Sequence, residues 1–141
     1  MATSNSPSRT PFLLLFRNAG LDTHASLNEA ERAAMTRRWN EWYDNLEKDG
    51  KAAGGSPLAL EGRVVTGRTG QVVTDGPYAE AKEIVGGYVI LTVAGMDEAT
   101  AIAQQVPGLA TDLIVEIREI VPASPALDGV KGHAPKPRVV A

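Results

Sequence analysis

The chain of 141 residues predicts an α+β fold in which two helices cover one face of an antiparallel sheet. Three observations support this prediction. Apolar residues recur at helical spacing in two segments, and apolar runs or alternating residues occupy the segments around them. The resulting order is strand, helix, strand with an inserted hairpin, strand, helix, strand. This order is typical of the ferredoxin-like βαββαβ arrangement.

The first strand and the first helix have the clearest patterns. Residues 12–17 form a nearly continuous apolar run, which indicates a central strand buried on both faces. Ser26 is expected to cap the helix that follows, with Glu29 at the capping-box spacing, and Gly50 is expected to end it. The helix has an apolar stripe at steps of four, three and four residues, which we interpret as packing rather than ligand stacking. The stripe consists of Met35, Trp39, Trp42 and Leu46.

The middle of the chain predicts short strands. Residues 53–60 and 62–73 are β-like but interrupted by glycines. Paired valines at 64–65 and 72–73 lie on either side of residues 66–70, a five-residue loop in the pattern of a hairpin. Residues 87–93 alternate between two faces of a strand. One face carries Val89, Leu91 and Val93, and the other carries Tyr88, Ile90 and Thr92.

A second helix and a last strand complete the domain. Asp97 is expected to cap a helix that runs to Gln105. The helix is expected to pack through Met96, Ala99, Ile102 and Ala103. Residues 113–120 alternate as a strand. Because both helices would cover the same sheet face, the apolar residues of the other face would be exposed in a single chain. We therefore expect a two-fold homodimer in which the sheets face each other.

The overall composition excludes several classes of function. A net charge of −3 gives no electrostatic basis for binding nucleic acid, and the absence of cysteine excludes thiolate chemistry. The apolar run at 12–16 is too short to span a membrane and lacks the flanks of a signal peptide, so we expect a cytoplasmic protein without membrane association. No metal-ligand spacing and no nucleotide-binding glycine pattern occur, so no metal or cofactor is expected.

Composition also predicts a single domain between two tails. Residues 1–10 are small and polar and are expected to form a disordered lead. Residues 122–141 carry four prolines and little apolar material, so they are expected to lie outside the core. The folded domain is therefore expected to span residues 11–121.

The segment after the predicted hairpin concentrates turn-forming and ionisable residues. Asp75-Gly76-Pro77 is a chain-reversal signal, and Glu80, Lys82 and Glu83 follow it. Asp75 is interpreted first as a turn cap, with a general base in a cleft as the functional alternative. The charged residues that follow are more often a solvated surface than a site.

Residues 73–80, followed by Lys82-Glu83 and Gly86-Gly87-Tyr88, resemble the signature of the YCII-related proteins of the DGPF type. Tyr78 stands where that family usually has Phe. The similarity extends over about residues 12–121 and includes the stripe of the first helix. The resemblance implies a dimeric α+β barrel, which agrees with the dimer expected from the uncovered sheet face.

The resemblance implies little about activity. Some distant YCII-type relatives resemble lactone isomerases and dehalogenating enzymes that use a His–Asp pair in the cleft. Here His24, an expected exposed loop residue, precedes the first helix and His133 lies in the tail, so neither clearly matches that pair. Other DGPF-type proteins are encoded with, or fused to, extracytoplasmic-function sigma factors, which implies regulation.

Our first hypothesis is a homodimer that binds a small polar or anionic metabolite in a cleft between sheet and helices. Any reaction would be cofactor-free acid–base chemistry, with Asp75 as the base and Arg17 or Arg118 as the anion anchor. The alternatives are a non-catalytic regulatory module associated with a sigma factor, and a purely structural dimer. The other expected ligand-binding residues are Tyr78, Glu83 and Tyr88.

Overall fold

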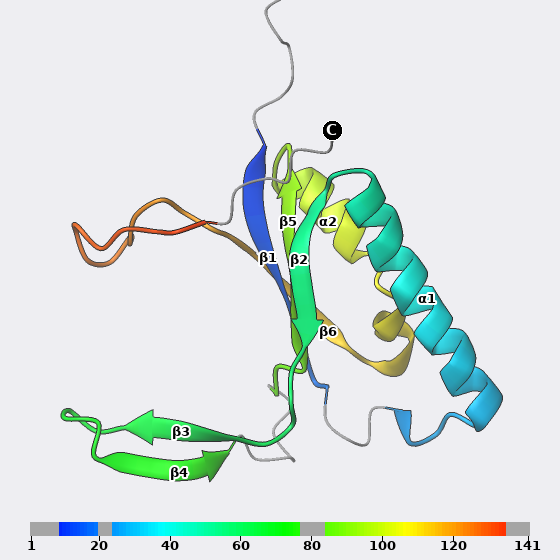
Figure 1. Ribbon diagram of the computed structural model, residues 1–141, viewed down its shortest axis with the longest axis horizontal. Coiled ribbons are helices and arrows are strands. Elements are labelled where there is room, and N and C mark those ends of the chain that lie inside the picture. The colour runs from blue at the N-terminus through cyan, green and yellow to red at the C-terminus, as the bar shows by residue number, and fades with distance from the viewer. Residues whose placement is uncertain (1–8, 20–23, 77–83, 135–141) are drawn as a thin grey trace, which may run out of the picture.

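The structure is a computed structural model that describes residues 9–19, 24–76 and 84–134. A four-stranded sheet lies against helices α1 (Glu29–Lys48) and α2 (Met96–Ala103), which both cover the same face (Figure 1). Its strands are ordered β2–β5–β1–β6, and every neighbouring pair is antiparallel. They span Thr10–Arg17 (β1), Ala52–Pro57 (β2), Gly87–Val93 (β5) and Ile114–Glu119 (β6). The predicted α+β class is confirmed, and the strand order is compatible with a ferredoxin-like fold.

Two smaller elements complete the described chain. Strands β3 (Gly62–Thr66) and β4 (Val72–Gly76) form a separate two-stranded sheet, which confirms the predicted hairpin. A 3₁₀-helix, η2 (Pro107–Thr111), joins α2 to β6. Most of the expected disordered lead and the end of the expected tail lie outside the described residues.

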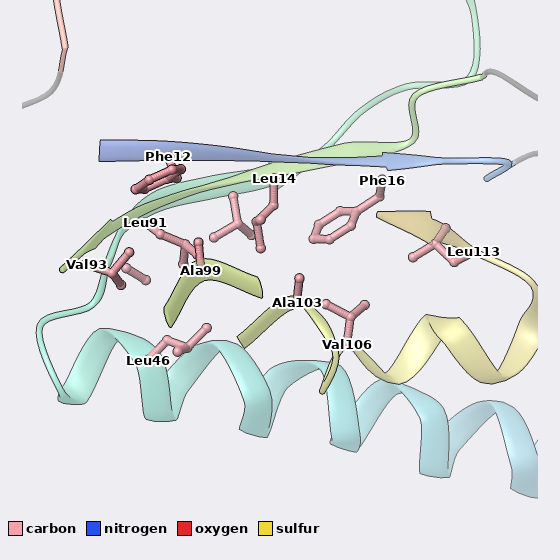
Figure 2. Packing of buried hydrophobic residues seen from close by; sticks show 12 residues of the cluster. Phe12, Leu14, Phe16, Leu46, Leu91, Val93, Ala99, Ala103, Val106 and Leu113 are labelled. Atoms are coloured by element: carbon pink, nitrogen blue, oxygen red, sulfur yellow. The ribbon is translucent and has the colours of Figure 1, made fainter. Parts of the chain in front are cut away.

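The core lies between the sheet and the two helices, as Figure 2 shows. Phe12 and Leu14 of β1 and Leu91 of β5 are at most 1% exposed. Ala99 and Ala103 of α2 are also buried, and such small side chains let a helix approach a sheet closely. The predicted stripe of α1 is confirmed by two buried residues, Met35 and Leu46, and two tryptophans that pack on the core.

Only one face of β1 is fully buried within a single chain, and burial of the other face stays a prediction that depends on the expected dimer. Phe12, Leu14 and Phe16 are buried, whereas Leu13 and Leu15 are partly exposed. The central position predicted for this strand is nevertheless confirmed, because β1 pairs with both β5 and β6.

The helix caps differ from the prediction. The N-cap of α1 is Asn28, not Ser26: its side chain accepts a hydrogen bond from Glu31 N at 2.8 Å, and Glu31 Oε1 accepts one from Asn28 N at 3.0 Å. The capping-box spacing occurs twice in this stretch, at Ser26–Glu29 and at Asn28–Glu31, and the second pair forms the cap. Gly50 does follow the helix end with a φ of 72°, as predicted.

Helix α2 begins before Asp97, so Asp97 lies in the first turn and is not the N-cap. Its N-cap is Gly95, which offers no side chain, and Glu98 Oε1 instead accepts a hydrogen bond from Ala94 N at 2.8 Å. The helix ends at Ala103, before the predicted Gln105, and Met96 is 47% exposed rather than packed.

Glu98 also joins α2 to the start of β2, because its carboxylate lies 3.1 Å from Lys51 Nζ. The hydrogen bond from Ala94 and, next, the lysine hold the pKa of Glu98 below its ordinary value of 4.5. A lowered pKa stabilises the folded state above the ordinary value, and this stability is lost as the pH falls through the lowered pKa.

We therefore expect Glu98→Gln to lower the free energy of unfolding by up to about 1 kcal/mol at neutral pH. The difference from the wild type should shrink below the ordinary pKa of 4.5. Urea unfolding at neutral pH and at about pH 3.5 measures both values. Glu119→Gln, at an exposed carboxylate, is the matched control. If the loss of free energy of unfolding in E98Q is the same at both pH values, the charge of Glu98 does not contribute to stability.

The sheet face turned away from the helices, called here the helix-free face, is partly apolar. Strand register aligns Leu13 of β1 with Ile90 of β5, and Leu15 with Tyr88. All four side chains are only partly exposed, although no described element covers them. On β6 the same face carries Ile114, Glu116 and Arg118.

Candidate functional site

A cavity of about 550 Å³ opens on the helix side of the sheet. It lies where α1, the turn before α1 and the end of β2 meet. Its size is within the range of ordinary small-molecule sites. The residues that line it are Phe16, Ala19, His24, Trp39, Asn40, Trp42, Tyr43, Asp44, Gly55, Ser56, Pro57, Leu58, Leu60, Gly86, Gly87, Tyr88, Val89 and Leu113.

An aromatic cluster forms one wall of the cavity. The ring of Phe16 lies 5.1 Å from Trp39 and 6.2 Å from Trp42, centre to centre, and the two tryptophan rings are 5.9 Å apart. All three contacts are edge-to-face, the geometry that aromatic pairs prefer. Trp42 Nε1 also donates a hydrogen bond to Ile102 O of α2 at 3.3 Å. These contacts fix the wall in place before any ligand binds.

Glycines let β2, which also lines the cavity, approach β5 closely. A Cβ on Gly55 of β2 would lie 2.7 Å from Tyr88 O and 2.9 Å from Val89 Cγ2. The preceding Gly54 has a φ of 124°, a conformation that favours glycine, and the strand register shifts between Ala52 and Gly55. The predicted glycine interruption therefore produces a β-bulge at the cavity.

His24 is the polar residue of the cavity with the most unusual environment. Its Nδ1 atom is buried yet has no hydrogen-bond partner among the residues that the structure describes. The main chain at this position is held firmly, because His24 O accepts hydrogen bonds from Leu27 N and Arg32 Nη2, both at 3.1 Å. A buried polar atom without a partner is uncommon in folded proteins, and His24 is also one of the residues that line the cavity.

The family model of the YCII-related domain matches residues 16–124. The chain belongs to the YCII-related family. The match runs from the end of β1 past β6, well over half of the chain, and so confirms the family suggested by the residue pattern. No curated protein matches the chain.

Within this YCII-related domain, the predicted site residues do not converge on one place. Asp75 is exposed on β4, opposite Arg63, and does not line the cavity. Tyr88 is among the lining residues, but the alternation along β5 turns its side chain to the helix-free face, away from the cavity side. Tyr78 and Glu83 lie outside the described residues, as do Glu80 and Lys82.

The two predicted anion anchors lie on the other side of the sheet. Arg17 Nε is 3.1 Å from Glu116 Oε1, and Arg118 Nη1 is 3.2 Å from Glu116 Oε2. All three belong to the helix-free face, since Arg17 alternates with the buried Phe16 and pairs with β6. One carboxylate thus lies between two guanidinium groups, away from the cavity.

The sequence predicts an exposed loop position for His24 and favours packing over ligand stacking for Trp39 and Trp42, whereas the structure places His24, partly buried, in the cavity lining beside both tryptophans. Nothing in the local sequence distinguishes His24 from an ordinary loop histidine. The described residues hold no group of three or more His, Cys, Asp or Glu side chains placed to bind a metal ion. Within the same residues, no helix is long and apolar enough to cross a membrane.

Proposed function

We propose that this YCII-related protein binds a small organic metabolite in the cavity beside α1. The observation that carries the proposal is His24, whose Nδ1 is buried and unpartnered and which lines the cavity together with Trp39 and Trp42. The aromatic wall favours a planar or apolar body on the ligand. His24 and its neighbours Asn40 and Ser56 would contact a polar or anionic group.

Any turnover would be cofactor-free acid–base chemistry such as an isomerisation. An imidazole can accept and return a proton near neutral pH. In this scheme His24 Nδ1 takes a proton from one carbon of the ligand and returns it to another, so no oxidant or further reactant is consumed. His24 replaces Asp75 as the proposed base because it lines the cavity and Asp75 does not.

The proposal includes a homodimer through the helix-free faces. Leu13, Leu15, Tyr88 and Ile90 form an apolar surface on the two central strands that needs a cover. A second copy supplies a surface of the same shape and polarity, as two-fold symmetry requires. We also retain the DGPF type as part of the proposal, on the motif at residues 73–80.

Ligand binding can be tested with the protein's own fluorescence, because both tryptophans of the chain line the cavity. Small aromatic and aliphatic carboxylic acids that bind should change this fluorescence and raise the melting temperature. His24→Gln should weaken binding of such an acid by about tenfold, the loss of one hydrogen bond to a charged group.

The chain offers a matched control, since its other histidine, His133, is exposed outside the cavity. His133→Gln should bind like the wild type. If no acid changes the fluorescence, or if H24Q binds as tightly as H133Q, the cavity is not the site. The alternative, a regulatory module without turnover, would then be favoured, and a sigma-factor gene beside this one would support it.

A further inference from the structure

The β3–β4 hairpin, residues 62–76, exposes apolar side chains on both of its faces. We call it the first arm. Val65 is 61% exposed and Val73 is 55% exposed, and the two face each other across the strands. Val64 and Val72 alternate with them on the opposite face and are 42% and 43% exposed. Because two-stranded hairpins are marginally stable alone, apolar side chains on both faces indicate that this arm packs against something.

A second projection of the chain, residues 121–134, has the same character. We call it the second arm. It is closed by hydrogen bonds from Ser124 N to Val130 O and from Gly132 N to Pro122 O, at 2.8 and 2.7 Å. Leu127 at its tip is 64% exposed and Val130 is 50% exposed. Exposed apolar residues thus occur on both projections of the described chain.

Both arms extend to the same side of the sheet, away from the helices (Figure 1). The first arm leaves near the end of β2 and the second follows β6, so they project from two ends of the molecule. Between them lies the helix-free face with its apolar centre at Leu13 and Ile90. Two arms beside an apolar face form a surface suited to a macromolecular partner rather than to a small ligand.

The dimensions of the first arm fit a second copy of this chain as that partner. Its five-residue strands correspond to a length of about 17 Å. Sheets that pack face to face are about 10 Å apart. An arm of this length, projecting on the side of the helix-free face, therefore passes the plane of a second sheet that covers that face. In such a dimer the arm would lie beside the body of the second copy.

We propose that the first arm of each copy packs its valines against the second copy of this chain. This inference depends on the dimer in the proposed function but not on the ligand. The polar tip of the arm, Gly67-Arg68-Thr69-Gly70-Gln71, does not fit insertion into a membrane. The net charge of −3 does not fit a nucleic acid partner.

The test is the double variant V65T/V73T, measured by sedimentation equilibrium. Threonine keeps the shape and strand preference of valine but replaces one of its two methyl groups by a hydroxyl, so the apolar surface is reduced while the hairpin is preserved. The dimer dissociation constant should rise by about tenfold or more, since each dimer loses four valine contacts. Met96→Gln is the matched control, because Met96 is 47% exposed on the helix side, and it should leave the constant unchanged.

Hydrogen exchange of wild-type arm peptides gives an independent measurement. Peptides that span residues 62–76 should become more protected as the protein concentration rises through the dissociation constant. If the wild type is a dimer but V65T/V73T dimerises equally well, the arm proposal is wrong and the sheet-face dimer stands. If the wild type is a monomer at about 100 μM, both proposals about the dimer fail. Ligand binding is measured separately on the same samples, so its failure is distinguishable from either result.

Discussion

Replacing Leu91 by alanine is expected to lower the free energy of unfolding by about 3 to 4 kcal/mol. Leu91 is fully buried on the central strand β5, in register with Phe12 of β1 and Ala52 of β2. Removing its side chain leaves a cavity that close-packed neighbours fill only in part. Because single domains are stable by about 5 to 15 kcal/mol, this loss brings the protein near to unfolding.

Urea unfolding followed by circular dichroism measures this effect, with Leu109→Ala as the control for residue type. Leu109 lies on η2 and is 40% exposed, so its loss should cost less than about 1 kcal/mol. If Leu91→Ala and Leu109→Ala lower the free energy of unfolding by the same amount, the core does not centre on Leu91.

Sequence reasoning predicted the elements whose signals are local. The stripe of α1 follows from helical spacing, and the hairpin follows from valines that flank a glycine-rich loop. The cap of α1 was misplaced by two residues because Ser26–Glu29 and Asn28–Glu31 offer the same capping-box spacing. The spacing alone does not distinguish the two pairs.

The candidate site was predicted less well because it depends on contacts between distant segments. His24 reaches the cavity only because the turn before α1 lies beside the end of β2, and no local pattern encodes that approach. The position of Arg17 could have been predicted, however. It alternates with Phe12, Leu14 and Phe16 along β1, so a core on that side places Arg17 on the opposite face.

The charged motif after the hairpin illustrates the difference between a family signature and a site. Asp75 contributes to the pattern that identifies the family, yet it lies exposed on an arm and away from the cavity. A sequence signature can reflect the folding or assembly of a domain as well as its chemistry. Under the arm proposal, the first arm positions Asp75 near the second copy.

Replacing Leu13 by aspartate is expected to abolish the proposed dimer while leaving the monomer folded. Leu13 lies on the central strand β1, in register with Ile90 on one side and Arg118 on the other. In the monomer the introduced carboxylate remains hydrated and has the Arg118 guanidinium, on a side chain 70% exposed, as a neighbour. Between two facing sheets it would have to lose its water, in both copies at once.

Sedimentation equilibrium should therefore find the dissociation constant of L13D raised by about a thousandfold or more, with an unchanged far-ultraviolet circular dichroism spectrum. Leu13→Met is the control, because methionine conserves volume and apolarity and should retain the dimer. The contrast with Leu91→Ala separates the two faces of the sheet: the buried face determines whether the chain folds, and the helix-free face determines whether two chains associate. A dimer that persists in L13D would move the contact away from the sheet and would overturn both the sheet-face dimer and the arm proposal that depends on it.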